Sequence, residues 1–137
     1  MRLAYLATPY SHESSLVMEQ RVIEADHVAA ELLKCGVNVF SPITHSHRLL
    51  PHFEANKQGK CFAKTWEFWK EVDIDLLSRC DCLVVICVEG WMESTGVQAE
   101  IAHAVDVGMP RHYINSAEDV KNIAKNILEP RKLISMI

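Results

Sequence analysis

The run Cys82–Val88 constrains the fold of this chain more than any other segment. It is continuously apolar over seven residues and rich in β-branched side chains. This pattern is typical of a parallel strand covered on both faces. Parallel strands are joined by crossover helices, so the rest of the chain should alternate strands and helices. The run is also the longest unbroken apolar stretch, well below the ~20 residues that a membrane helix needs, so no membrane span is expected.

The other apolar segments supply this alternation. Leu3–Ala7 ends at Thr8-Pro9 and predicts a strand, and Val37–Phe40 ends at Ser41-Pro42 and predicts a second. Further elements are expected as helices over 16–33, 61–78, 94–107 and 117–128, a strand over 112–114, and a long loop over 43–60. The predicted fold is α/β: a Rossmann-like three-layer fold with a parallel sheet of four to five strands, formed by residues 1–137 as a single domain.

Composition and charge narrow the class of function. The 14 Lys and Arg against 18 Asp and Glu give a net charge of −4, with no basic patch, which argues against binding of a nucleic-acid polymer. The N-terminal apolar stretch is too short for a signal peptide, so we expect a cytoplasmic protein with reduced thiols. Cys80-x-Cys82 lacks a second Cys/His pair, and His45-x-His47 lacks a third ligand on its loop, so no metal is expected.

Polar residues gather where the predicted strands end. Ligands of parallel α/β sheets bind beyond the carboxyl ends of the strands. The chain has no G-x-G-x-x-G fingerprint, no P-loop and no G-x-S-x-G elbow, so no organic cofactor is expected. The polar segments at these strand ends are 8–12, 41–47, 89–96 and 115–116.

The junction 89–100 is the richest of these segments. Thr95 with Gln98 can form a capping box, or Ser94 can cap the following helix directly. Gly96 would let a ligand approach the backbone closely. The free N–H groups of a helix N-terminus suit an anion.

Three acidic residues and a tyrosine are candidates for chemistry. Glu100 follows one turn or so into the helix, and Asp73 and Asp75 lie near a predicted helix C-terminus, where acidic residues are unfavourable. Tyr5 lies two residues before the end of the first strand. Each has an ordinary alternative, a solvated carboxylate or a core tyrosine. Together they would suit glycosidic-bond chemistry, in which one carboxylate attacks the anomeric carbon and another group protonates the leaving base.

These residues belong to motifs that resemble the nucleoside 2-deoxyribosyltransferase superfamily over about residues 3–113. Within it, the chain is most similar to a family of small uncharacterised bacterial and phage proteins with Ala-Thr-Pro-Tyr-Ser-His near the start and Ser-Pro-Ile-Thr-His-Ser-His after the second strand. The motifs are Tyr5-Leu-Ala-Thr-Pro-Tyr10, Asp73 placed eight residues before Asp81, and Ser94-x-Gly96-Val97-x-x-Glu100 followed by Ala-x-x-x-Gly-x-Pro110.

The resemblance implies roles for the three site residues. Glu100 would be the nucleophile and form a covalent (deoxy)ribosyl intermediate. Asp73 would position the sugar and assist proton transfer to the base, and Tyr5 would hydrogen-bond Glu100. Ser94 stands where transferases of the superfamily tend to have an acid. A serine at this position is similar to the pattern of the nucleotide N-hydrolase branch, whose substrates carry a 5′-phosphate. A hydroxyl at a helix N-terminus donates to a phosphate that an aspartate would repel.

The implied reaction is cleavage of the N-glycosidic bond in a (deoxy)nucleoside 5′-monophosphate, with water as acceptor. The alternatives are a nucleoside 2-deoxyribosyltransferase with a base as acceptor, and a non-catalytic nucleotide-binding or sensing module. The partner is then a small nucleoside or nucleotide. The superfamily often builds its sites across subunits, so we expect a homodimer or higher homo-oligomer, to which the apolar tail Leu133–Ile137 would contribute.

Several further residues are candidates for substrate binding. The hydrolase branch often carries an Arg in the first loop; here Ser11, His12 and His45 or His47 would contact the phosphate. Trp91 would stack on a nucleobase or, alternatively, plug the strand edge, whereas Trp66 and Trp69 are expected in the core or in a dimer contact. The complete substrate-binding set is Thr8, Pro9, Ser11, His12, His45, His47, Trp91, Ser94 and Gly96.

Overall fold

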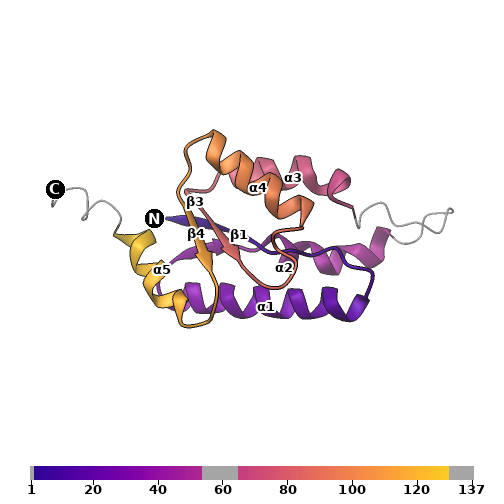
Figure 1. The fold of residues 1–137 in the computed structure, drawn as a ribbon, viewed down its shortest axis with the longest axis horizontal. Coiled ribbons are helices and arrows are strands. Elements are labelled where there is room, and N and C mark those ends of the chain that lie inside the picture. The colour runs from indigo at the N-terminus through magenta and orange to yellow at the C-terminus, as the bar shows by residue number, and fades with distance from the viewer. Residues whose placement is uncertain (1, 54–64, 130–137) are drawn as a thin grey trace.

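A four-stranded parallel sheet lies at the centre of the molecule, in a computed structural model that describes residues 2–53 and 65–129 (Figure 1). Its strand order is β2-β1-β3-β4, and all three neighbouring pairs are parallel. The expected α/β fold with a parallel sheet is therefore confirmed. The strands are β1 (Leu3–Ala7), β2 (Asn38–Phe40), β3 (Cys82–Ile86) and β4 (Arg111–Ile114).

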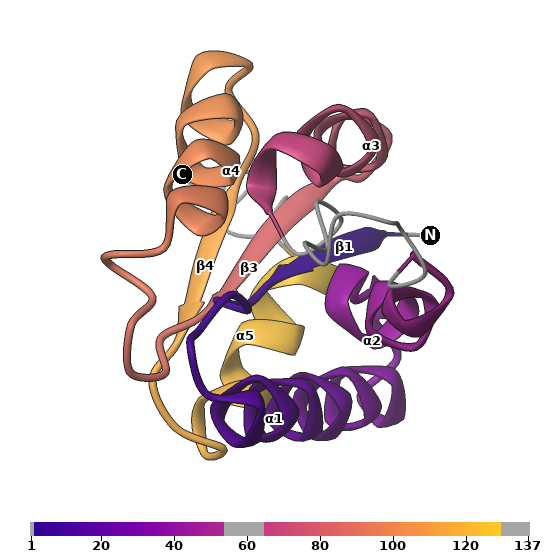
Figure 2. The ribbon, with the colours of Figure 1, turned by 90° about the vertical axis from the view of Figure 1, so that its right-hand side faces the viewer.

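Helices cover both faces of the sheet and make the three layers. One face carries α1 (Ser15–Lys34) and α5 (Asp119–Leu128), and the other carries α3 (Trp66–Ser78) and α4 (Thr95–Asp106), as Figure 2 shows. Every residue of β3 is buried, as the sequence pattern of this strand predicts. None of the helices within 2–53 and 65–129 is long and apolar enough to cross a membrane.

The segment after β2 differs from its prediction. Residues 43–60 were expected to form a loop, but the described part contains α2 (Pro42–Ser46) and the 3-10 helix η1 (His47–Phe53). Pro42 occupies the start of α2, where a proline favours a helix because its missing N–H would have no partner there. Helices this short do not repeat often enough to give a periodic pattern. Residues 54–60, and the predicted start of α3 over 61–64, lie outside the described residues.

Alternation along β1 decides which side chains reach each layer. Ala4 and Leu6 pack in the core beneath α1 and α5, whereas Tyr5 and Ala7 pack in the core beneath α3 and α4. Successive residues of a strand point to opposite faces, so this placement follows from the register of β1. Tyr5 therefore lies in the same layer as α4.

The end of β3 leads into α4 through a capped turn. The Oγ of Ser94 accepts a hydrogen bond from the N–H of Val97 at 3.2 Å, so Ser94 caps the helix directly and the alternative box with Thr95 is not used. The chain runs from β1 to β2 on one side and to β3 on the other, so the sheet reverses its strand order between β1 and β3. Such a switch point is where α/β sheets bind ligands.

Candidate functional site

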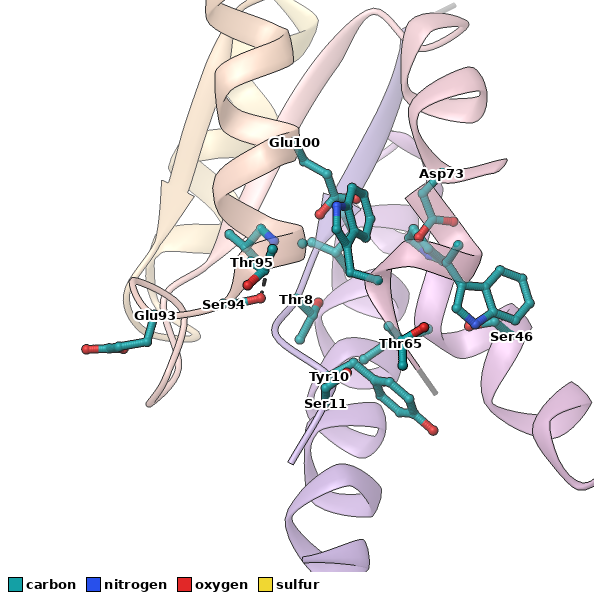
Figure 3. Close-up of a pocket in the computed structure, with 17 residues that line it drawn as sticks. Thr8, Tyr10, Ser11, Ser46, Thr65, Asp73, Glu93, Ser94, Thr95 and Glu100 are labelled. Carbon is teal, nitrogen blue, oxygen red and sulfur yellow. Dashed lines mark hydrogen bonds between the residues drawn. The ribbon is translucent and has the colours of Figure 1, made fainter. Parts of the chain in front are cut away.

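A cavity of about 420 Å³ opens at this switch point, between the loop after β1 and the helices α2, α3 and α4 (Figure 3). It is framed by apolar side chains and by hydroxyl and carboxyl groups that come from segments far apart in the sequence. Its polar lining residues are Thr8, Tyr10, Ser11, Ser46, Thr65, Asp73, Glu93, Ser94, Thr95 and Glu100.

Glu100 is a buried carboxyl group at the inner end of this cavity. Only 5% of the residue is exposed, so the alternative of a solvated helical glutamate is excluded. The hydroxyl of Tyr5 donates a hydrogen bond to its Oε2. The pKa of Glu100 is raised to about 8: burial is the largest cause, the hydrogen bond from Tyr5 lowers the pKa, and the nearby charge of Asp73 raises it. The strand and the helix thus hold one oxygen and leave the other to the cavity.

Asp73 faces the same cavity from α3. Its side chain and that of Glu100 project into the cavity from different helices (Figure 3). Asp73 is partly buried, and this burial raises the pKa of its carboxyl group to about 6. Asp75, the other acid of the pair, is exposed and lies 3.3 Å from Arg79 in an ion pair, so it takes the ordinary solvated role.

Tyr5 remains a protonated donor in this environment. Burial raises the pKa of its hydroxyl far above the ordinary value, and the charges of Glu100 and Asp73 raise it further. A phenol that stays neutral can only donate to the carboxylate beside it. The structure therefore brings Tyr5, Asp73 and Glu100 into one electrostatically coupled group.

The outer end of the cavity holds hydrogen-bond donors. Thr8 is 7% exposed, and its Oγ1 is buried without a hydrogen-bond partner among residues 2–53 and 65–129. A buried hydroxyl with no protein partner is rare in native structures, which makes Thr8 a candidate donor to a bound molecule. Beside it, the amides of Thr95 and Gly96 precede the first intrahelical hydrogen bond of α4 and remain available to a ligand.

Two tryptophans of α3, Trp66 and Trp69, also line the cavity and are only partly buried, so they do not belong to the core. Their expected alternative role in a dimer contact stays a prediction. Trp66 and Trp69 lie three residues apart, and Asp73 lies four residues beyond Trp69, so all three share one helix face. Gly96 also lines the cavity, and a Cβ added to it would lie 3.1 Å from Cε3 of Trp66. The glycine thus makes room for the indole.

Three predicted binding residues of the strand-end loops do not line this cavity. Pro9 is buried beneath it, and Nδ1 of His12 accepts a hydrogen bond from the N–H of Ser14 at 2.9 Å, at the start of α1. Trp91 packs against Tyr113 of the edge strand β4, with ring centroids 5.9 Å apart. This contact corresponds to the alternative role of Trp91 at the strand edge.

The two histidines after β2 lie outside the lining as well. His45 packs against Phe40 at 6.0 Å between ring centroids. His47 lies 2.7 Å from the hydroxyl of Tyr10 and 2.8 Å from Oε2 of Glu19. Because Tyr10 lines the cavity, His47 supports the site through this tyrosine. In the part of the chain that the structure describes, no three His, Cys, Asp or Glu side chains group closely enough to hold a metal ion.

Sequence reasoning missed several lining residues, of which Tyr10, Trp66 and Trp69 are the largest. The helical spacing of Trp66, Trp69 and Asp73 was a usable signal. A carboxyl group on an otherwise aromatic helix face indicates that this face lines a site and is not packed in the core. The positions of Ser46 and Thr65 depend on how α2 and α3 pack, and no local sequence pattern indicates them.

The chain was compared with known proteins. A solved structure, the 2-deoxyribosyltransferase from the psychrotolerant bacterium Bacillus psychrosaccharolyticus, is 20% identical, covers 88% of this chain and 90% of its own, and superposes with a TM-score of 0.56. At this identity the likeness shows the fold. No curated protein matches. Residues 2–115 match the model of a family described as a domain of unknown function, DUF1937, and the chain therefore belongs to that family.

Proposed function

We propose that this protein cleaves the N-glycosidic bond of a (deoxy)nucleoside 5′-monophosphate, with Glu100 as nucleophile and water as the final acceptor. The observation that carries the proposal is the pairing of two carboxyl groups of raised pKa in one cavity, with Glu100 held by the phenol of Tyr5. Perturbed carboxyl groups that face a common cavity are typical of glycosyl-transfer sites.

The first step forms a glycosyl ester. The free oxygen of Glu100 attacks the anomeric carbon as the bond from that carbon to the base nitrogen breaks, and the bonding electron pair leaves with the base. At neutral pH, pKa values of about 8 for Glu100 and about 6 for Asp73 leave the pair with roughly one proton, held mainly by Glu100. The reactive form has Glu100 ionised and this proton on Asp73, which supplies it to the departing base. Tyr5 donates to Oε2 of Glu100 and so directs the other oxygen toward the sugar.

The second step releases the sugar. A water molecule attacks the anomeric carbon, the ester bond breaks, and Glu100 regains its electron pair as a carboxylate. Asp73, which gave its proton to the base, now accepts one from the water, as microscopic reversibility requires. The same pair of carboxyl groups thus serves both steps.

The outer end of the cavity supports a phosphorylated substrate. The unpartnered hydroxyl of Thr8 and the free amides at the start of α4 are donors, and a helix N-terminus carries partial positive charge. Ser94 and Glu100 are six residues apart, which places about 9 Å of helix axis between them. A phosphate at the helix end and a sugar at Glu100 would fit this separation. Of the described residues that line the cavity, none is a lysine or arginine.

The second candidate is transfer of the sugar to another base. It is favoured by the fold shared with a 2-deoxyribosyltransferase. Both reactions would use the same ester at Glu100 and differ only in what attacks it. The substrate-binding roles of Pro9, His12, His45, His47 and Trp91, and the role of residues 133–137 in a subunit interface, stay predictions. The latter residues lie outside those that the structure describes.

The test is incubation with a panel of nucleoside 5′-monophosphates and their dephosphorylated nucleosides, with the released bases separated by chromatography. Free base and sugar phosphate support hydrolysis, whereas a swapped nucleoside after addition of a foreign base supports transfer. Glu100→Ala and Glu100→Gln should abolish turnover, and the matched variant Glu71→Gln, at an exposed position of α3, should retain it. A fully active Glu100→Ala protein would refute the proposal. Calorimetric binding without base release, unchanged in Glu100→Gln, would identify a sensing module instead.

A further inference from the structure

Arg21 of α1 connects the two loops that flank the cavity. Its Nη1 donates to the carbonyl oxygen of Ser11 at 3.0 Å and, at a longer 3.4 Å, to that of Tyr10. Its Nη2 donates to the carbonyl oxygen of Glu89 at 3.0 Å. The first two acceptors belong to the loop after β1, and the third belongs to the loop after β3. One guanidinium group therefore joins two chain segments that are far apart in the sequence.

Gly90 accommodates this guanidinium. Its φ is +94°, a conformation that L side chains rarely adopt, and an added Cβ would lie 2.4 Å from Nη2 of Arg21. The positive φ favours glycine at this position, and a side chain here would also force the guanidinium of Arg21 to move. The loop after β3 is shaped around this arginine.

The two loops carry donors of the outer cavity on opposite sides. Thr8 and Ser11 come from the first loop, and Ser94 follows the second and begins α4. Arg21 does not line this cavity; it lies behind the loops, in a second hollow that shares Ser11 and Glu93 with the first. Arg21 therefore acts through the loops and does not touch the substrate.

The inner end of the cavity is held by other contacts. Glu100 is fixed by its helix and by Tyr5 from the middle of β1, and Asp73 belongs to α3. None of these three residues contacts Arg21 in the described hydrogen bonds. Loss of Arg21 should therefore alter the outer, donor-rich end and leave the reacting groups in place.

We propose that Arg21 is a positioning residue that holds the loops after β1 and β3 at a fixed separation, so that Thr8 and the start of α4 face the same phosphate. The proposal rests on the proposed function for the identity of the ligand, and the joining of the loops by Arg21 can be tested without it. Arginine suits the task because its planar fork of donors reaches both loops at once, which the single ammonium of lysine cannot do.

The first experiment measures amide hydrogen exchange in segments 8–13 and 87–93 of the unliganded protein. Arg21→Ala and Arg21→Lys should accelerate exchange in both segments together, while β1, β3 and the body of α4 keep their protection. Arg79→Ala, which removes an exposed arginine paired with Asp75, is the matched control and should change neither segment. Unchanged exchange, or acceleration in only one of the two loops, would overturn the proposal.

The second experiment asks whether Arg21 and Gly90 act as one unit. Gly90→Ala should also loosen both loops, because the added methyl group displaces the guanidinium. In an Arg21→Ala background the same substitution should cost less stability and change exchange less, since no guanidinium remains to be displaced. Fully additive effects of the two substitutions would contradict this coupling. Millimolar methylguanidinium should partly restore the protection of both loops in Arg21→Ala, because truncation of this side chain, which lines the second hollow, leaves room for it.

The third experiment connects the loops to the substrate. Arg21→Lys should raise the KM for a nucleoside 5′-monophosphate about tenfold, the cost of weakening one or two hydrogen bonds to a charged group, and change kcat less than about twofold. The KM for the dephosphorylated nucleoside should change less. A fall in kcat with an unchanged KM would refute the positioning role. If the wild-type protein cleaves no nucleotide, the proposed function fails, whereas hydrogen exchange still decides whether Arg21 holds the loops.

Discussion

Replacing Glu100 by glutamine should make the protein more stable at alkaline pH. Glutamine has nearly the shape of glutamate, and its side-chain oxygen can still accept the hydrogen bond from Tyr5. The substitution therefore removes the ionisation of a buried group and leaves its packing intact. The gain in stability should depend on pH in a way that follows from the pKa of Glu100.

The sign and size of this gain can be worked out. The pKa of Glu100 is raised from 4.5 to about 8 in the folded protein, chiefly by burial. Below about pH 4.5 the carboxyl group is protonated in both states and costs nothing. Between the two values the unfolded chain loses the proton and the folded protein keeps it, so the free energy of unfolding falls by about 1.4 kcal/mol for each pH unit. Above pH 8 the total decrease in the free energy of unfolding is at most about 5 kcal/mol.

The assay is urea unfolding of the wild-type protein and of Glu100→Gln at intervals from pH 5 to pH 9. The difference in the free energy of unfolding should grow in favour of the variant as pH rises, and level off above about pH 8. The other titrating groups, Asp73 included, are present in both proteins and largely cancel. A difference that stays constant across this range would show that Glu100 is not a buried carboxyl group of raised pKa.

Three further substitutions probe the same cavity. Tyr5→Phe removes a hydrogen bond that lowers the pKa of Glu100, so the titration midpoint of that carboxyl, followed by carbon NMR, should move to higher pH, and a fall would contradict the hydrogen bond. Asp73→Asn removes a neighbouring negative charge, so the same midpoint should move to lower pH. Gly96→Ala places a Cβ 3.1 Å from Trp66, so the indole resonance of Trp66 should shift while stability changes by less than about 1 kcal/mol; an unmoved indole would argue against this packing.

The fold could be predicted from the sequence because its signals are local and agree with one another. The apolar run at 82–88 marks one strand, and the alternation of short apolar segments with longer helical segments marks the other elements. The observed bounds lie close to those expected. The helices α2 and η1 could not be found in this way. They are short and each contains a proline, and their packing on the rest of the fold stabilises them more than a repeated apolar face does.

The site could be predicted mainly where a reactive side chain lies in a segment that follows the end of a strand. Ser94 and Glu100 belong to the helix that follows the end of β3, and the topology of the sheet brings that helix to the cavity. Asp73 lies midway along α3 and reaches the cavity through the packing of α3 against α4. The histidines follow a strand end too, but His47 points toward Glu19 and Tyr10. In helices this short, the direction of a side chain depends on tertiary packing, and the sequence alone does not encode it in a recognisable pattern. For the same reason Arg21, in the middle of a helix, carries no local mark of its contacts with two loops.

The features that disfavour ionised carboxyl groups in the cavity of the free protein are those that would help the reaction. The charge of Asp73 disfavours ionisation of Glu100, and burial strengthens this effect because little water screens the two groups. An N-glycosidic bond that breaks leaves positive charge on the sugar, and this charge would develop between Glu100 and Asp73. The interaction is then stronger in the transition state than with the neutral sugar, which is the condition for catalysis. Asp73→Asn should therefore ease the ionisation of Glu100 and still slow base release, and a variant that ionises more easily and also turns over faster would show that the paired charge plays no part.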